Sequence, residues 1–200
     1  MRPMALQQKA KVMTSSSLKI LGLSGSLRKG SYNTAALKTA QALAPEGVSI
    51  EIASIGGLPL YDADIQAQGF PADVLSLAEQ IRAADAVLIV TPEYNYSTSG
   101  VLKNAIDWIS RVPNQPFAGK PIALMSASMS LHGGVRAQYH LRQIFVFLDG
   151  LVLNKPEVFI AQAHTRFDDQ GTLTDEPTRG FVRQLVESLA VWTRNLSAAA

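Results

Sequence analysis

The chain of 200 residues contains no cysteine, which excludes disulfide bonds and thiolate chemistry. It also lacks any apolar run of about 18 residues, the length that a membrane-spanning helix needs. Charged residues make up 17% of the chain and hydrophobic residues 47%, a balance unlike that of a disordered chain. These features predict a single globular domain without a membrane span, in a reducing compartment such as the cytoplasm.

Acidic residues are absent from the first 45 positions, which hold seven lysines and arginines, whereas the rest of the chain has a net charge of about −5. This asymmetry favours a positive field that attracts anionic ligands, although a basic tail beside an ordinary domain would give the same count. The basic residues do not form the dense stripe that nucleic-acid binding requires, so no nucleic-acid partner is expected.

The first seventeen residues, "MRPMALQQKAKVMTSSS", are polar and show no periodicity. They lack the apolar core of a signal peptide, and Met13 is a plausible internal start. We therefore expect a flexible N-terminal extension over residues 1–17 and one domain over residues 18–200.

Short apolar runs alternate with amphipathic stretches along the rest of the chain. Strands are expected at 18–25, 48–54, 86–92, 120–128 and 158–163, and helices at 31–45, 73–85, 100–111, 133–150 and 179–195. This alternation predicts an α/β fold with a parallel sheet and helices on both faces. Five strands favour the flavodoxin-like order 2-1-3-4-5, whose ligands bind where the first and third strands end.

The loop after the first strand reads "GSLRKGSYN". Gly25 and Gly30 let the backbone approach a ligand closely. Groups suited to binding an anion follow at Ser26, Arg28, Ser31 and Asn33, and a helix starting near Ser31 or Tyr32 adds its first amides. A serine-capped helix start would explain one serine but not the whole set.

Two common nucleotide motifs do not fit this loop. A Walker loop needs a lysine before Ser31, and the dinucleotide fingerprint needs glycines at a different spacing from Gly22 and Gly25. A monophosphate such as that of FMN remains. The loops "TPEYNYSTSG" and "SASMSLHGG", after the third and fourth strands, would supply walls for a planar ring.

Together, "GSLRKGSYN", "TPEYNYSTSGVLKNAIDWISR" and the "GG-x-R" helix start resemble the NADPH-dependent FMN reductase family. The similarity is closest to its bacterial chromate/quinone reductase branch and runs from about Leu18 to the end of the chain. It implies tightly bound FMN, NADPH or NADH as donor, quinones and less specifically chromate, azo compounds or free flavin as acceptors, and a homodimer or homotetramer.

The resemblance also implies roles for individual residues. It assigns the FMN phosphate and ribityl region to the first loop, with cofactor-binding positions Ser26, Leu27, Arg28, Gly30, Ser31, Tyr32 and Asn33. It assigns the isoalloxazine ring to Pro92, Glu93, Tyr94, Asn95 and Tyr96. It also places a cofactor-binding residue, Ser128, in the third loop, "SASMSLHGG". No side chain is expected to be catalytic, because hydride would pass to FMN N5 in ping-pong turnover.

A few residues outside these loops are further candidates. His132 lies in the third loop and is a possible substrate contact. Arg136 and Tyr139 share a helical face, which is either solvated or a subunit contact with Glu157 as acidic partner. No histidine pair has metal-ligand spacing, so no metal is expected.

Two other functions are compatible with the same fold. A flavodoxin-like electron carrier would bind FMN without using NAD(P)H, and such carriers tend to have a strongly acidic docking face, unlike this slightly basic chain. A flavin-binding sensor without turnover is the other alternative.

Overall fold

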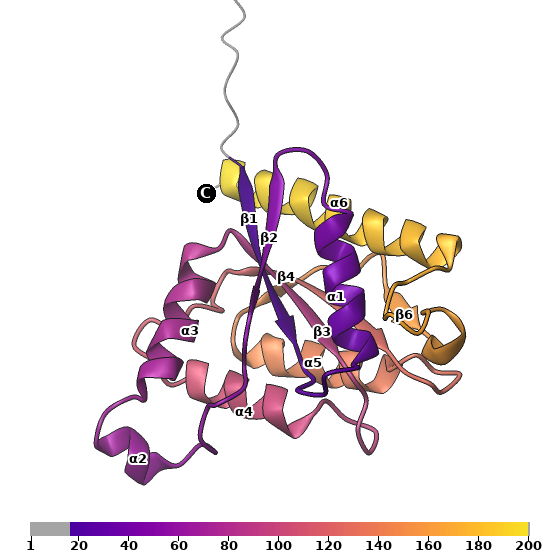
Figure 1. Cartoon of the computed structure of the whole chain (residues 1–200). Helices are drawn as coiled ribbons and strands as arrows, with labels where there is room; N and C mark the ends of the chain where they lie inside the picture. The colour runs from indigo at the N-terminus through magenta and orange to yellow at the C-terminus, as the bar shows by residue number, and fades with distance from the viewer. Residues whose placement is uncertain (1–16, 200) are drawn as a thin grey trace, which may run out of the picture.

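The computed structural model describes residues 17–199, so the expected extension lies almost wholly outside the described residues (Figure 1). Four long strands form most of a parallel sheet: β1 (Leu18–Ser24), β2 (Val48–Ala53), β3 (Ala86–Thr91) and β4 (Pro121–Ala127). Their order is β2-β1-β3-β4, with all pairs parallel. The predicted fold class and strand order are confirmed.

The fifth strand position differs from the prediction, because two short strands share it. β5 (Leu151–Val152) pairs with the start of β4, and β6 (Val158–Ile160) pairs with its end. Pro156 lies between them and has no N–H to donate to a ladder. The single strand predicted at 158–163 is therefore wrong in its bounds: it ends at Ile160, and the 3₁₀ turn η1 (Ala163–Thr165) follows.

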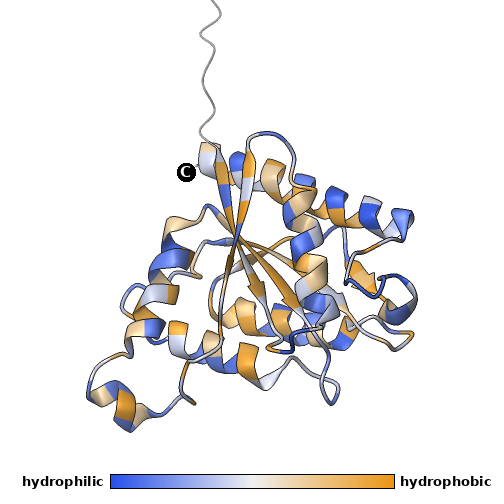
Figure 2. Ribbon diagram, viewed as in Figure 1, coloured by the Kyte–Doolittle hydropathy of each residue, from blue (hydrophilic) through white to orange (hydrophobic). Residues whose placement is uncertain are grey.

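Helices cover both faces of the sheet, as predicted. α1 (Tyr32–Ala42) and α6 (Glu176–Ala199) pack on one face, and α3 (Ala72–Ala83), α4 (Gly100–Ile109) and α5 (Val135–Phe147) pack on the other. β3 and β4 are buried along their whole length, which explains why their sequences are almost entirely apolar (Figure 2). The short helix α2 (Ala63–Ala67) was not predicted, and it has no buried residue from which a periodicity could arise.

Within the described residues, no helix is both long and apolar enough to cross a membrane.

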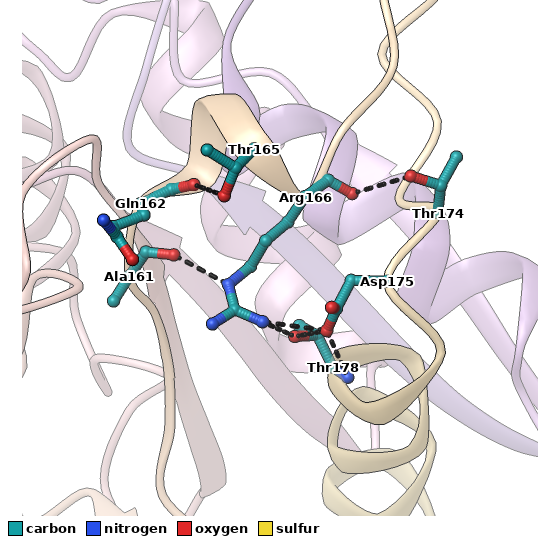
Figure 3. A network of polar contacts seen from close by, with 7 residues as sticks. All are labelled: Ala161, Gln162, Thr165, Arg166, Thr174, Asp175 and Thr178. Atoms are coloured by element: carbon teal, nitrogen blue, oxygen red, sulfur yellow. Dashed lines mark hydrogen bonds and ion pairs between the residues drawn. The ribbon is translucent and has the colours of Figure 1, made fainter.

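A polar network fixes the segment that joins β6 to α6 (Figure 3). Arg166 donates to the Ala161 carbonyl at 2.8 Å and to the Asp175 carboxylate at 2.8 Å. The same carboxylate accepts hydrogen bonds from the hydroxyl and the amide of Thr178, in the first turn of α6. Asp175 thus caps α6, which is why this helix begins before the predicted position 179.

The Asp175 carboxylate should make the stability of this segment sensitive to acid. The hydrogen bonds from Thr178, with a smaller contribution from Arg166, hold the pKa of Asp175 below its usual range. Its contribution is therefore present above the unfolded pKa of about 3.9 and is lost as pH falls through the lower folded pKa. We expect Asp175→Asn to lower the urea midpoint at pH 7, with the difference from wild type shrinking towards pH 3.

The matched control is Glu187→Gln, an exposed acid on α6. It should leave the urea midpoint close to that of wild type. A constant difference between Asp175→Asn and wild type across this pH range would contradict the assignment.

Candidate functional site

The loops that follow β1, β3 and β4 meet around a pocket of about 360 Å³ at the carboxyl ends of these strands. Nine of its lining residues belong to the predicted cofactor-binding set: Ser26, Arg28, Ser31, Tyr32, Asn33, Pro92, Glu93, Tyr94 and Ser128. Ala127 and Met129 also line it and were not predicted, because neither carries a polar signal in the sequence. The structure thus brings all three predicted loops to one site.

The β1 loop presents hydrogen-bond donors to this pocket. Ser31 is the N-cap of α1, and its hydroxyl accepts from the Thr34 amide at 3.4 Å. The amides of Tyr32 and Asn33, in the first turn, find no acceptor among residues 17–199. Arg28 is exposed and makes no ion pair within those residues. A helix N-terminus beside an uncommitted guanidinium suits a phosphate group.

Asn33 lines the pocket and also makes a structural link across it. Its side-chain amide donates to the Ala127 carbonyl at 3.0 Å, and its side-chain oxygen accepts from the Ala127 amide at 2.8 Å. Asn33 is buried, so these two bonds replace bonds to water. The residue therefore ties the start of α1 to the end of β4, and it shapes the pocket through this link.

The loop after β3 forms a tight two-residue hairpin. Tyr94 and Ser97 exchange backbone hydrogen bonds of 2.9 and 3.0 Å, and both central residues have positive φ, 49° at Asn95 and 68° at Tyr96. This is the geometry of a type I′ turn. Tyr94 lines the pocket, whereas Asn95 and Tyr96 do not.

A partly buried ion pair anchors this hairpin to α5. The Glu93 carboxylate accepts from the Arg136 guanidinium at 2.6 Å and from the Arg136 backbone amide at 3.0 Å. The guanidinium also lies 3.9 Å from the centre of the Tyr96 ring, a cation–π contact. Within the chain, Arg136 thus pairs with Glu93, and Glu157 lies 3.9 Å from Arg142. A contact between Arg136 and Glu157 of another subunit stays a prediction.

The pair between Glu93 and Arg136 should be strongly coupled, because their side chains are only 10% and 28% exposed. In a double-mutant cycle with Glu93→Gln and Arg136→Met, we expect a coupling energy of about 1 to 3 kcal/mol. Arg136→Met should be the more damaging single change, since it leaves a nearly buried carboxylate unpaired. Urea unfolding of the four proteins measures the coupling.

The control cycle uses Lys103→Gln and Asp107→Asn, an ion pair on α4 whose side chains are 46% and 39% exposed. It should give only about 0.3 to 0.5 kcal/mol. Similar coupling in the two cycles would mean that burial adds nothing to the pair between Glu93 and Arg136.

The third loop is held close to β6. The amide of Ser128 donates to the Ile160 carbonyl at 3.0 Å, and the Ser128 hydroxyl donates to that of Ser130 at 3.1 Å. The remaining predicted residues do not line the pocket: Leu27, Gly30, Asn95, Tyr96, His132, Arg136, Tyr139 and Glu157. Among the described residues, no group of three possible metal ligands occurs, so nothing at the site suggests a metal.

The chemistry of the lining fits FMN. Its polar end, with Ser26, Arg28 and the first amides of α1, suits a phosphate. Its other side combines Pro92, the Tyr94 ring and Met129, and such apolar and aromatic walls suit a planar ring. A pocket of this kind, at the switch point of a flavodoxin-like sheet, defines the class of FMN-binding proteins.

Comparison with known proteins narrows this class. The family model for NADPH-dependent FMN reductase matches residues 18–165. The chain is 58% identical over 182 residues to an NAD(P)H-dependent FMN reductase of Pseudomonas aeruginosa, covering 91% of this chain and 98% of the relative. It is 53% identical over 167 residues to a quinone reductase of Escherichia coli, covering 82% and 89% of the two chains.

A solved structure of another flavoenzyme is also similar to this chain. The flavoenzyme NAD(P)H:acceptor oxidoreductase FerB from Paracoccus denitrificans superposes with a TM-score of 0.80 at 36% identity, covering 89% of this chain and 98% of that one. The chain therefore belongs to the NADPH-dependent FMN reductase family. The prediction of an oxidoreductase that uses FMN and NAD(P)H is confirmed.

Proposed function

We propose that this protein carries electrons from NAD(P)H to quinones through FMN bound in the pocket between the β1, β3 and β4 loops. The proposal rests on one observation. A single pocket is lined by hydrogen-bond donors that lack an acceptor among the described residues, which suit a phosphate, and by apolar walls, which suit a planar ring. The relatives named FMN reductase and quinone reductase, at 58% and 53% identity, support the acceptor class.

Each part of the pocket has a task in this proposal. Ser26, Arg28 and Ser31 hold the phosphate, while Pro92, Tyr94 and Ser128 bound the ring. When bound, FMN supplies two-electron transfer between a nicotinamide and an acceptor.

In this proposal the side chains of the pocket position FMN and its substrates, and none of them transfers a proton. Glu93 is the lone carboxylate in the pocket lining, and both of its oxygens are bonded to Arg136. It is therefore not available as a general base. Because Tyr94 and Met129 are 52% and 63% exposed at the pocket, the site is open to a flat substrate. Donor and acceptor would occupy this opening in turn, which gives ping-pong kinetics.

Several finer features belong to the same proposal. Chromate, azo compounds and free flavin would be less specific acceptors at the open site, and the cysteine-free chain would work in the cytoplasm. A homodimer or homotetramer is supported by large apolar side chains left exposed on α5, with Val146 at 81% and Phe147 at 90%. Tyr139 is exposed on the same helix.

The test is an anaerobic absorbance spectrum of the purified protein. We expect flavin absorption that bleaches on addition of NADPH or NADH and returns on addition of benzoquinone. Flavin absorption that the nicotinamides leave unchanged would contradict the proposed turnover and favour a carrier or a sensor. Protein that neither contains FMN nor binds added FMN would contradict the assignment of the pocket.

A further inference from the structure

A second pocket, of about 370 Å³, lies on the other side of the start of α1. Its walls are the outer side of α1 and the segment between η1 and α6, and it shares Ser31 and Tyr32 with the first pocket. The proposed function assigns no role to this second pocket. Because the two pockets share these lining residues, they adjoin, and a long ligand could reach from one to the other.

The far wall of this pocket is a defined hairpin. Phe167 and Leu173 pair as an antiparallel bridge, and the Gly171 amide donates to the Asp168 carbonyl at 3.0 Å. Just before the hairpin, Arg166 ties the chain to α6 through Asp175 and Thr178 (Figure 3). The Phe167 ring packs against that of Tyr32 with centroids 5.3 Å apart, so one wall of the pocket is aromatic and fixed.

The charged groups in the lining are of both signs. Lys29 and Lys38 are exposed and make no ion pair among residues 17–199, and His164 lies near them. Asp168 is committed to its own turn, since it accepts from the amides of Gln170 and Thr172 at 3.0 and 2.7 Å. Asp169 has no hydrogen-bond partner among the described residues and is the carboxylate left for a ligand.

This combination fits a nucleoside phosphate better than simpler ligands. A bare anion would meet the repulsion of the aspartates, and an apolar ligand would desolvate the lysines without replacing their bonds to water. In a phosphorylated adenosine, phosphate groups would pair with the lysines, the ribose hydroxyls would donate to Asp169, and the base would contact the aromatic wall.

We propose that this second pocket binds the phosphorylated adenosine end of the nicotinamide donor, while the nicotinamide lies at the first pocket. This inference rests on the proposed function, which makes NAD(P)H the donor. The adenosine end carries a 2′-phosphate in NADPH and a free hydroxyl in NADH, and both also carry the pyrophosphate. Lys38 and Asp169 would therefore be specificity-determining residues for the donor.

The test uses ADP-ribose and its 2′-phosphorylated form, which lack nicotinamide, in calorimetric titrations of the FMN-loaded protein. We expect Lys38→Gln to weaken binding by about 5- to 10-fold, the loss of one charge-assisted hydrogen bond. A larger loss for the 2′-phosphorylated probe would place Lys38 at the 2′-phosphate, and equal losses would place it at the pyrophosphate. Asp169→Asn should raise the dissociation constant of ADP-ribose.

The matched control is Lys19→Gln, an exposed lysine at the amino end of β1, whereas the pocket lies beyond the carboxyl end of this strand. It should bind both probes as wild type does. Equal dissociation constants for wild type, Lys38→Gln and Asp169→Asn would overturn the inference, even in a protein that turns over NADPH. Binding that depends on Lys38 in a protein without turnover would support the pocket and contradict only the proposed function.

Discussion

Replacing Arg28 with alanine is expected to weaken FMN binding by about 10- to 100-fold, the value of a hydrogen bond between two charged groups. Arg28 is the one cationic side chain that lines the first pocket, and within residues 17–199 it has no competing acid. The Tyr32 ring, 5.7 Å from the guanidinium, is its nearest aromatic contact. The loss should appear as a raised dissociation constant when FMN fluorescence is titrated with FMN-free protein.

Two further variants sharpen this experiment. Arg28→Lys should recover part of the affinity, because it restores the charge without the planar fork of donors. Arg183→Ala removes an exposed arginine from α6, away from the pocket, and should leave the dissociation constant unchanged. The difference in FMN dissociation constant between wild type and Arg28→Ala should also become smaller as salt is added, since the guanidinium is exposed. An unchanged affinity in Arg28→Ala would remove this residue from the phosphate site.

Replacing Gly133 with alanine should lower the free energy of unfolding by about 2 to 4 kcal/mol, through steric overlap combined with backbone strain. Gly133 has a φ of 59°, and an added Cβ would lie 2.9 Å from the carbonyl carbon and the Cβ of Phe159. That neighbour is the backbone of β6, which is held in the sheet and cannot turn aside. Urea unfolding measures the loss.

Gly180 offers the opposite case in the same chain. It lies within α6, and an added Cβ would meet nothing within 4 Å. Gly180→Ala should therefore stabilise the protein by about 0.5 to 1 kcal/mol through helix propensity. If Gly133→Ala and Gly180→Ala changed stability in the same direction, the close approach of the third loop to β6 would not explain the effect of Gly133→Ala.

The sequence was sufficient for the elements that have strong periodicity. β3 and β4 are almost entirely apolar because they are buried on both faces, and α4 carries an apolar stripe because one of its sides faces the sheet. The division of the fifth strand was missed, although Pro156 was a usable signal. α2 could not be predicted, since a five-residue helix without buried residues has no pattern to read.

The candidate site was predictable where donor groups cluster in sequence and not where partners are distant. Nine predicted residues line the pocket because they lie in loops that a parallel sheet must bring together. The partner of Arg136 was missed, since Glu93 is 43 positions away and lies in a different loop. The second pocket was also missed, because its two walls come from opposite ends of the chain.

The link from Asn33 to Ala127 has a consequence for how the cofactor enters. Two hydrogen bonds join the first and third loops inside the protein alone, so these loops need not wait for a ligand to find their relative positions. The receptor is largely preformed, and little ordering entropy opposes association. FMN should then associate in a single kinetic phase whose rate rises in proportion to its concentration, without a slow rearrangement that sets a ceiling.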